Sequence, residues 1–322
     1  MGMARRRCKS AILGLLLAGC GRVGFAPLSE GDGGVTAPVD AAGDGASVGP
    51  DARPFASCVL YGDPVRLDGL DLGEDQATSL SADGLEIMFH SSSSAFADTD
   101  IYVARRLDVS SSFVNPMLAT DLSTTSRDET PALAPAGRSL YFASSRTPIL
   151  GGAFDIWSAT RPAPDQPWSG LTHEAALSST DSDGGATTTA DGLEVFLHRS
   201  RQPDLSDLDI YCATRSSPTD VFDNAARVNE IDSPGRDLDP WISPDGLVLY
   251  FASEMTGTLG NADLWLATRP DRSSPFATIR QLETVNTNGI EIAPWPSADG
   301  RTLYFTSDRG GTFDLWAAPC IE

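Results

Sequence analysis

The residues of this chain that are best placed to do chemistry are five acids, which recur at one position of a repeated pattern. Each lies eight residues before the first residue of a recurring two-residue turn: Asp75, Asp128, Asp183, Asp237 and Glu291. Hard cations such as calcium prefer carboxylate oxygens as ligands. If the repeats form a ring, these five acids predict a ligand or cation ring at one mouth of its central channel.

A structural role is the alternative interpretation of the same acids. Each could accept hydrogen bonds from nearby backbone groups or pair with an arginine of a neighbouring repeat. Five unpaired carboxylates would repel one another strongly, so this interpretation requires partners or raised pKa values. The recurrence of an acid in every repeat favours the structural role, and calcium binding stays open as a hypothesis.

Several other kinds of chemistry are excluded or find little support. The only lysine is Lys9, so no Schiff-base or P-loop lysine exists further along the chain. Lys and Arg number 23 against 44 Asp and Glu, and the formal net charge of -21 disfavours a nucleic-acid partner. His90, His173 and His198 lack metal-ligand spacing, which predicts structural roles. No cofactor motif is present.

Five internal repeats must position the acids. Their turns are spaced by 53, 55, 54 and 54 residues: Asp83-Gly84, Ala136-Gly137, Asp191-Gly192, Asp245-Gly246 and Asp299-Gly300. Asp-Gly between apolar runs is typical of a tight hairpin, because glycine provides the positive φ that the turn needs. An apolar triplet such as Leu249-Tyr250-Phe251 follows each turn, and its lack of alternation predicts burial on both faces.

A third strand begins at an aspartate in every repeat, as in Asp263-Leu264-Trp265, and a more polar fourth strand precedes the next repeat. Four of the third strands continue to an arginine: Arg105, Arg161, Arg215 and Arg269. Four strands per repeat, buried on both faces, predict an all-β, five-bladed β-propeller over residues 55–322. Six blades are the alternative if the region from Phe55 to Asp75 forms more than one strand.

The ends of the repeat region predict how the ring closes. The fifth repeat stops after its third strand at Trp316-Ala317-Ala318, and the missing fourth strand is expected at Pro64-Val65-Arg66-Leu67. Cys58 precedes this N-terminal strand, and Cys320 follows its expected antiparallel neighbour. In an exported, oxidising setting these positions predict a Cys58–Cys320 disulfide that clasps the ring.

The N-terminus has the features of an export signal and an anchor. Basic residues from Arg5 to Lys9 precede the short apolar run Ala11–Ala18, which is too short to span a bilayer. The run ends in Leu17-Ala18-Gly19-Cys20, which resembles the bacterial lipoprotein box. Residues 1–19 are therefore expected to be a signal peptide, Cys20 the lipidated residue, and 20–54 a flexible tether rich in Gly, Ala, Asp and Pro. Gly21, in place of an aspartate, favours the outer membrane, with the protein facing the periplasm or the cell surface.

The fourth repeat carries the clearest resemblance to a known family. Its segments Asp239-Pro240-Trp241-Ile242-Ser243-Pro244-Asp245-Gly246, Leu249-Tyr250-Phe251-Ala252-Ser253 and Asp263-Leu264-Trp265 resemble the WD-repeat-like β-propeller repeat of TolB-type bacterial envelope proteins. The resemblance extends over roughly residues 60–320. It implies protein contacts within the cell envelope, which is an inference from the fold alone.

Two functional hypotheses from different classes follow. The first is a lipid-anchored, non-catalytic protein-interaction module that binds another envelope protein and meets the membrane through its lipid alone. The alternative is a carbohydrate-binding or glycoside-hydrolysing propeller, which needs two or three non-equivalent carboxylates at the channel. The acids recur by repeat and single out no blade, which favours the first hypothesis.

Overall fold

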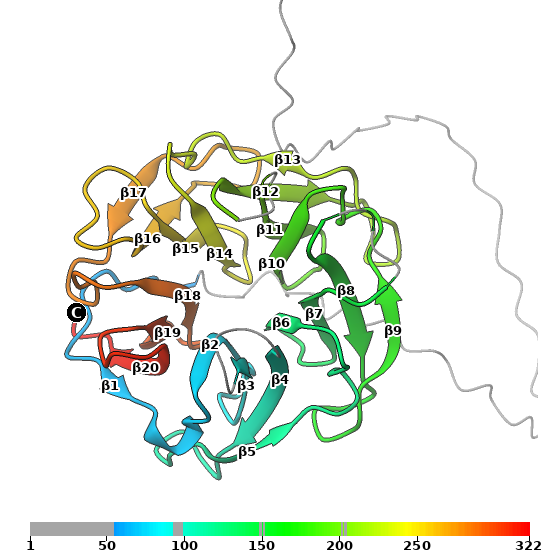
Figure 1. The fold of residues 1–322 in the computed structure, drawn as a ribbon. Helices are drawn as coiled ribbons and strands as arrows, with labels where there is room; N and C mark the ends of the chain where they lie inside the picture. The colour runs from blue at the N-terminus through cyan, green and yellow to red at the C-terminus, as the bar shows by residue number, and fades with distance from the viewer. Residues whose placement is uncertain (1–54, 93–98, 148–149, 151, 201, 203–204) are drawn as a thin grey trace, which may run out of the picture.

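A computed structural model of the chain describes residues 55–92, 99–147, 150, 152–200, 202 and 205–322. Five four-stranded antiparallel sheets are arranged as blades around a central axis (Figure 1). The predicted five-bladed β-propeller is therefore confirmed. The predicted signal peptide, Cys20 and the tether lie outside the described residues. The described part contains no helix with the length and apolar character that a membrane span requires.

Each of the first four blades is built from consecutive strands, which run in order from the innermost to the outermost. Blade 1 contains β2 (Glu74–Leu80), β3 (Glu86–Ser92), β4 (Thr99–Arg105) and β5 (Val114–Leu118). Blade 2 contains β6 (Asp128–Leu133), β7 (Ser139–Ser144), β8 (Asp155–Thr160) and β9 (Ser169–His173). Blade 3 contains β10 (Ser182–Thr188), β11 (Glu194–Ser200), β12 (Leu208–Thr214) and β13 (Ala226–Arg227). Blade 4 contains β14 (Asp237–Ile242), β15 (Val248–Ser253), β16 (Asp263–Thr268) and β17 (Thr278–Gln281).

Blade 5 joins the two ends of the described chain. It contains β18 (Glu291–Pro296), β19 (Thr302–Ser307), β20 (Asp314–Pro319) and the N-terminal β1 (Val65–Arg66). Val65 pairs with Ala317 and Arg66 with Trp316 in an antiparallel register, which confirms the predicted closure. Between Phe55 and Gly73 the structure has a single strand, β1, and one short 3-10 helix, η1 (Asp68–Leu70). The six-blade alternative is therefore wrong.

The apolar triplets form the core between the blades. Phe89, Phe142, Phe196, Phe251 and Phe305 are at most 1% exposed. Each innermost strand also contains a β-bulge, and the residue there has a positive φ: Ala77, Thr130, Gly185, Asp239 and Ala293. Four of these five residues are not glycine, so the chain maintains a strained backbone around the whole channel wall.

Candidate functional site

The five predicted acids, called the acid ring from this point on, lie at the start of the innermost strands. Their side chains belong to residues that are at most 1% exposed: Asp75, Asp128, Asp183, Asp237 and Glu291. None of them is among the residues that line the cavities along the central axis. The acid ring is therefore a set of buried groups at the start of the inner strands, outside the described lining of these two cavities.

Each ring acid accepts a backbone N–H from the loop just before its strand. The donors are Leu72, Thr124, Ser179, Ser233 and Thr287. In three blades an arginine from the second strand, or just after it, adds an ion pair: Arg146 with Asp128, Arg199 with Asp183, and Arg309 with Glu291. These contacts are those of the structural interpretation, in which the acid holds the loop between one blade and the next.

Asp75 and Asp237 lack such an arginine and lie close to other acids. Asp237 accepts the hydroxyl groups of Ser233 and Ser253, yet burial raises its pKa to about 6. Burial also raises the pKa of Asp75, and the nearby charges of Asp71 and Asp314 act in the same direction. Burial raises the pKa of Asp183 in blade 3 as well, although the charge of Arg199 acts in the opposite direction.

Two groups of carboxylates in the described residues have metal-ligand proximity. Asp71, Asp75 and Asp314 form one group, and Asp209, Asp232 and Asp237 form the other. Each already contains a cation: Arg66 pairs with Asp71 and Asp314, and Arg227 pairs with Asp209 and Asp232. Neither group contains two members of the acid ring. A calcium ion would have to compete with these guanidinium groups.

The three histidines have identifiable structural contacts. Nδ1 of His90 accepts the N–H of Thr130, and Nδ1 of His198 accepts the N–H of Asp239, both at 3.1 Å and both across a blade boundary. Burial lowers the pKa of His90, which keeps its imidazole neutral and able to accept. His173 lies 2.7 Å from Asp155 and packs against Trp157.

A narrow cavity follows the central axis at the level of the bulges. Its empty space, with the open solvent at its entrance included, is about 290 Å³, and it is lined by Thr78, Thr130, Thr187 and Asp239 together with apolar and glycine residues. Among the described residues, Asp239 is the only charged one in this lining, and 12% of its side chain remains exposed. We call this cavity the waist of the channel; its described lining therefore carries a single carboxylate.

A wider cavity, of about 470 Å³ with the open solvent at its entrance included, opens at the end of the axis where the Asp-Gly turns lie. We call it the turn-side mouth; its lining includes Trp241, Trp295, Pro135, Pro244, Pro296 and Ala298. Thr187 and Trp295 line both cavities, so the mouth continues into the waist. The lining of the mouth contains no charged residue among those that the structure describes.

The segment Phe55–Tyr61, called the strap, runs from this mouth to the outer edge of blade 5. The ring of Phe55 packs against Trp241 at 5.1 Å between centroids, and its N–H donates to Asp245. Gly300, with a φ of +70°, lets the backbone of Ala56 pass at a distance that a Cβ atom would block. The strap therefore begins at the rim of the channel.

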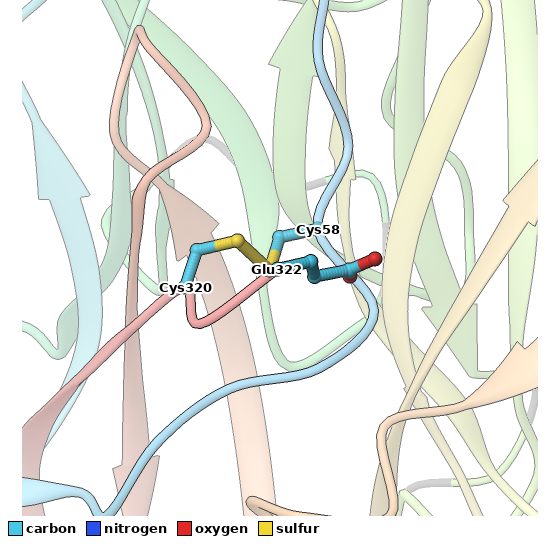
Figure 2. Close-up of side chains that lie close together, drawn as sticks. All are labelled: Cys58, Cys320 and Glu322. Carbon is cyan, nitrogen blue, oxygen red and sulfur yellow. A yellow bond between two sulfur atoms is a disulfide. The ribbon is translucent and has the colours of Figure 1, made fainter.

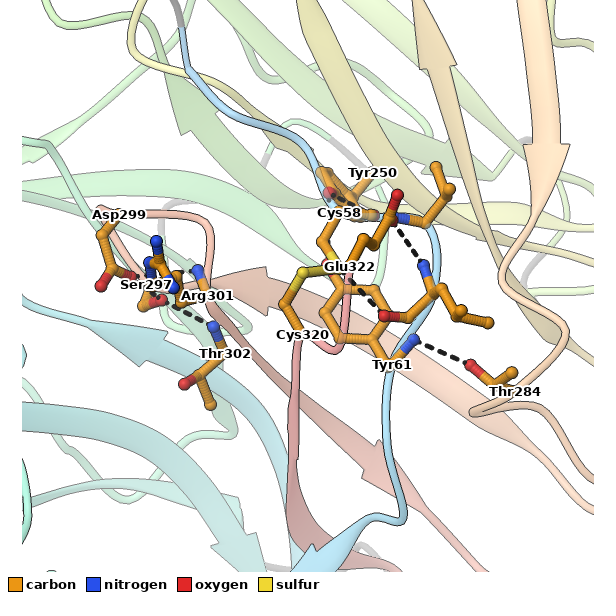
Figure 3. Close-up of a disulfide and its surroundings, with 12 residues drawn as sticks. Cys58, Tyr61, Tyr250, Thr284, Ser297, Asp299, Arg301, Thr302, Cys320 and Glu322 are labelled. Carbon is orange, nitrogen blue, oxygen red and sulfur yellow. Dashed lines mark hydrogen bonds between the residues drawn. A yellow bond between two sulfur atoms is a disulfide. The ribbon is translucent and has the colours of Figure 1, made fainter.

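A disulfide between Cys58 and Cys320 holds the strap, with the Cα atoms 6.0 Å apart (Figures 2 and 3). Glu322 lies beside the two sulfur atoms and accepts the N–H groups of Val59 and Leu60. The hydroxyl of Tyr250 donates to the carbonyl of Cys58, and the N–H of Tyr61 donates to Thr284 (Figure 3). The structure thus brings together the two cysteines that were named from the sequence and binds the strap to both blade 4 and blade 5.

Cys320 occupies the position that an arginine has in the other four blades. The residue directly after each third strand donates its N–H to the carbonyl that follows the turn glycine: Arg106, Arg161, Arg215, Arg269 and Cys320. The four arginines, called the seam arginines, also donate Nε–H to the turn glycine carbonyl of their own blade. Arg161 reaches Glu86 of the preceding blade, and Arg269 reaches Glu194. The disulfide therefore replaces an arginine cross-link.

Sequence reasoning missed two features of this region. In blade 1 the seam arginine is Arg106, whereas Arg105 is the last residue of β4; the sequence contains both, and only the register of the turn separates them. Asp239 lies two residues after the ring acid Asp237, and the spacing of the ring acids predicts no role for it. The signal was available: the equivalent positions of the other repeats hold Ala77, Thr130, Gly185 and Ala293, so Asp239 is the one acid there.

The comparisons with solved structures find the same fold in proteins of different activity. The α-L-arabinofuranosidase of Podospora anserina, in complex with cellotriose, has a TM-score of 0.52 and 11% identity over 83% of this chain and 95% of its own. The endo-arabinase of Bacteroides thetaiotaomicron also has a TM-score of 0.52, with 14% identity over 80% of this chain and 97% of its own.

TolB from Acinetobacter baumannii is similar at a TM-score of 0.49 and 15% identity over 77% of this chain. The chain spans about half of that TolB structure, 54% of its length. No protein-family model and no curated protein sequence matches the chain. At these identities the likeness is one of fold alone, and it assigns no activity to this chain.

Proposed function

We propose that this protein is a non-catalytic binding module of the bacterial cell envelope, anchored in the outer membrane by a lipid on Cys20. Its partner is another envelope protein that docks at the turn-side mouth. The observation that carries the proposal is the lining of this mouth, where Trp241, Trp295 and three prolines surround an open apolar cavity.

The mouth has the composition of a recognition surface. Aromatic residues in well-packed pockets dominate the binding energy of many protein interfaces, and concave apolar sites are the usual places for ligands. The ring of Phe55 already packs on Trp241, one of the residues that line the mouth. An aromatic or aliphatic side chain of a partner can pack there in the same way.

A catalytic function finds less support in the geometry. Glycoside hydrolysis needs two carboxylates that flank the sugar bond, roughly 5–9.5 Å apart. Among the described residues that line the two axial cavities, Asp239 alone carries a carboxylate. The ring acids already accept hydrogen bonds from loop N–H groups and, in three blades, form ion pairs with arginines.

The proposal is tested by crosslinking in cells, affinity capture and mass spectrometry of the native lipoprotein and two variants. Ala298→Arg places a long side chain at the exposed rim of the turn-side mouth. Ala277→Arg makes the same change at an exposed position beside β17, on the outer edge of blade 4, and serves as the matched control. We expect one protein to be enriched with the native form and with Ala277→Arg, and lost with Ala298→Arg.

Equal capture by the native form and Ala298→Arg would contradict docking at the mouth. Release of sugar from envelope polysaccharide by the purified protein, abolished in Asp239→Asn, would contradict the non-catalytic function. The anchor is tested separately by palmitate labelling, which we expect to be lost in Cys20→Ser together with recovery in the membrane fraction.

A further inference from the structure

We infer that the waist of the channel is a binding site for a cationic group, an ammonium or guanidinium that enters through the turn-side mouth and pairs with Asp239. The inference rests on the proposed binding function and names the chemistry of what is bound. Three observations carry it: the isolation of the Asp239 carboxylate, the aromatic approach to it, and the charge of the whole chain.

The carboxylate of Asp239 has no cationic partner that neutralises it among the described residues. Its nearest basic group is Nδ1 of His198, 3.4 Å from Oδ1. The same Nδ1 accepts the backbone N–H of Asp239 at 3.1 Å, so in this tautomer it has no proton to donate. The carboxylate is therefore left able to pair with a cation that enters the cavity.

The backbone fixes this carboxylate at the cavity wall. Asp239 has a φ of +49° at the bulge of β14, and its N–H is held by His198 across the boundary between blades 3 and 4. The hydroxyl groups of Thr78 and Thr187 donate to the carbonyls of Ala293 and Pro240. The Thr187 oxygen also accepts the N–H of Ile242, so the carboxylate of Asp239 is the charged acceptor that this cavity offers to an ammonium group.

The residues that line the approach to Asp239 also favour a cation over a neutral group. Trp241 and Trp295 line the mouth, and Trp295 lines the waist as well. Indole faces attract ammonium and guanidinium groups, most strongly where water is excluded. The formal charge of -21 adds a long-range attraction, which a narrow cleft with apolar walls focuses.

The decisive comparison uses two probes of equal length, pentylammonium and 1-pentanol, with the purified protein. Binding is followed by calorimetry and by the fluorescence of the tryptophans at the mouth. We expect pentylammonium to bind at least about tenfold more tightly than 1-pentanol at low salt, and this preference to shrink as salt is added. Equal binding of the two probes, or binding of neither, would overturn the inference without any variant.

Two variants locate the site. Asp239→Asn removes the charge and keeps the shape, and we expect it to abolish the preference for pentylammonium. Asp165→Asn removes an equal charge from an exposed loop and should leave the preference unchanged. Thermal unfolding of both variants first establishes that they fold. A preference that survives in Asp239→Asn would place cation binding elsewhere and contradict the assignment.

Further probes separate the two sources of such a group. Cadaverine represents a free amine, and an extended tetrapeptide with one lysine represents a partner protein; its norleucine counterpart is the control. Binding of cadaverine alone supports a small-molecule amine, and binding of the lysine peptide supports a partner side chain. If the norleucine peptide binds equally well, the inference is wrong. Capture of a partner at the mouth without any cation preference would leave the proposed function standing and remove only the cation site.

Discussion

The groups around each ring acid determine its electrostatic environment. The backbone N–H groups of the preceding loops take up one oxygen of each acid, and arginines take up the other in three blades. The five acids therefore differ in electrostatic environment although their positions in the repeats are equivalent. Burial raises the pKa of Asp75 and Asp237, which pair with no arginine among the described residues, and also that of Asp183, where the charge of Arg199 opposes the rise.

This difference predicts opposite effects of the same substitution in two blades. The pKa of Asp237 is about 6 in the folded protein against an ordinary value of 3.8, so folding is disfavoured once the carboxylate ionises. Its contribution to the unfolding free energy falls between about pH 4 and pH 6, by up to about 3 kcal/mol. In Asp237→Asn the unfolding free energy should fall less between these pH values, and the variant should be more stable than the native protein at pH 7.

Asp128→Asn is the matched control, because Asp128 is paired with Arg146. Removal of that charge leaves a largely buried guanidinium without its partner, and we expect destabilisation at pH 7 by roughly 2–4 kcal/mol. Urea unfolding of both variants between pH 4 and pH 8 measures these effects. Destabilisation of both variants at pH 7 would show that the two acids have the same role.

Calcium is a second test at the scale of side chains. We expect millimolar calcium or a chelator to move the unfolding temperature by less than about 1 °C, because arginines already occupy the two carboxylate groups with ligand spacing. Differential scanning calorimetry in both conditions gives the answer. A rise of several degrees with calcium, lost in Asp71→Asn, would instead assign a cation site to Asp71, Asp75 and Asp314.

The positions of the ring acids could be predicted from the sequence, whereas their role stayed open for a physical reason. Spacing places an acid at the start of an inner strand, but it does not show whether the side chain turns to the channel or into the boundary between blades. Asp239 illustrates the same limit. Only the bulge, which reorients one residue in each inner strand, places this carboxylate in the cavity wall.

At the scale of strands and loops, neighbouring blades are joined by buried ion pairs at their turn-side ends. Arg161 and Glu86 are each at most 6% exposed in their side chains, and Arg269 with Glu194 repeats the arrangement two blades further along. A blade of four strands packs against its neighbours through apolar side chains, which provide area but little directional restraint. The ion pairs fix the rotation of one blade against the next.

Glu86→Gln tests this cross-link. The variant leaves the guanidinium of Arg161 buried without an opposite charge, and we expect a loss of about 3–5 kcal/mol in the unfolding free energy. Glu254→Gln breaks the partly exposed pair with Arg236 and should cost less than about 1 kcal/mol. Similar losses in the two variants, measured by urea denaturation, would refute a special role for the buried pair.

At the scale of the whole molecule, the ring is closed by pairing, by packing and by one covalent bond. The strand β1 contributes only two residues to blade 5, so the strap and its disulfide supply much of the closure. Cys58 and Cys320 are separated by 262 positions, and a cross-link over such a long segment strongly restricts the unfolded chain.

Replacement of both cysteines by serine should lower the unfolding free energy by about 5 kcal/mol, because the unfolded chain regains the entropy of an open loop. The effect is measured by denaturation of the native and Cys58→Ser/Cys320→Ser forms. Reductant should reproduce it in the native form and leave the double variant unchanged. Peptide mapping under non-reducing conditions gives an independent check, and two free thiols would contradict the pairing.

The five internal repeats made it possible to predict the architecture from the sequence. Five equally spaced turns and the missing strand of blade 5 predicted both the number of blades and the closure by β1. The replacement of a seam arginine by Cys320 does not follow from the sequence pattern if Arg105 is taken as the arginine of blade 1. With Arg106 in that place, all five repeats align and the cysteine stands out as the one exception.

The position of the strap has a mechanical consequence. A pull on the chain ahead of Phe55 acts first on the non-covalent contacts of Phe55 with blade 4 and then on the first covalent link to the ring, at Cys58, three residues further on. The covalent bond passes the load to Cys320 and the end of β20, so the two-residue pairing of β1 carries none of it. The propeller would then resist tension in its native form and open from β1 once the disulfide is reduced.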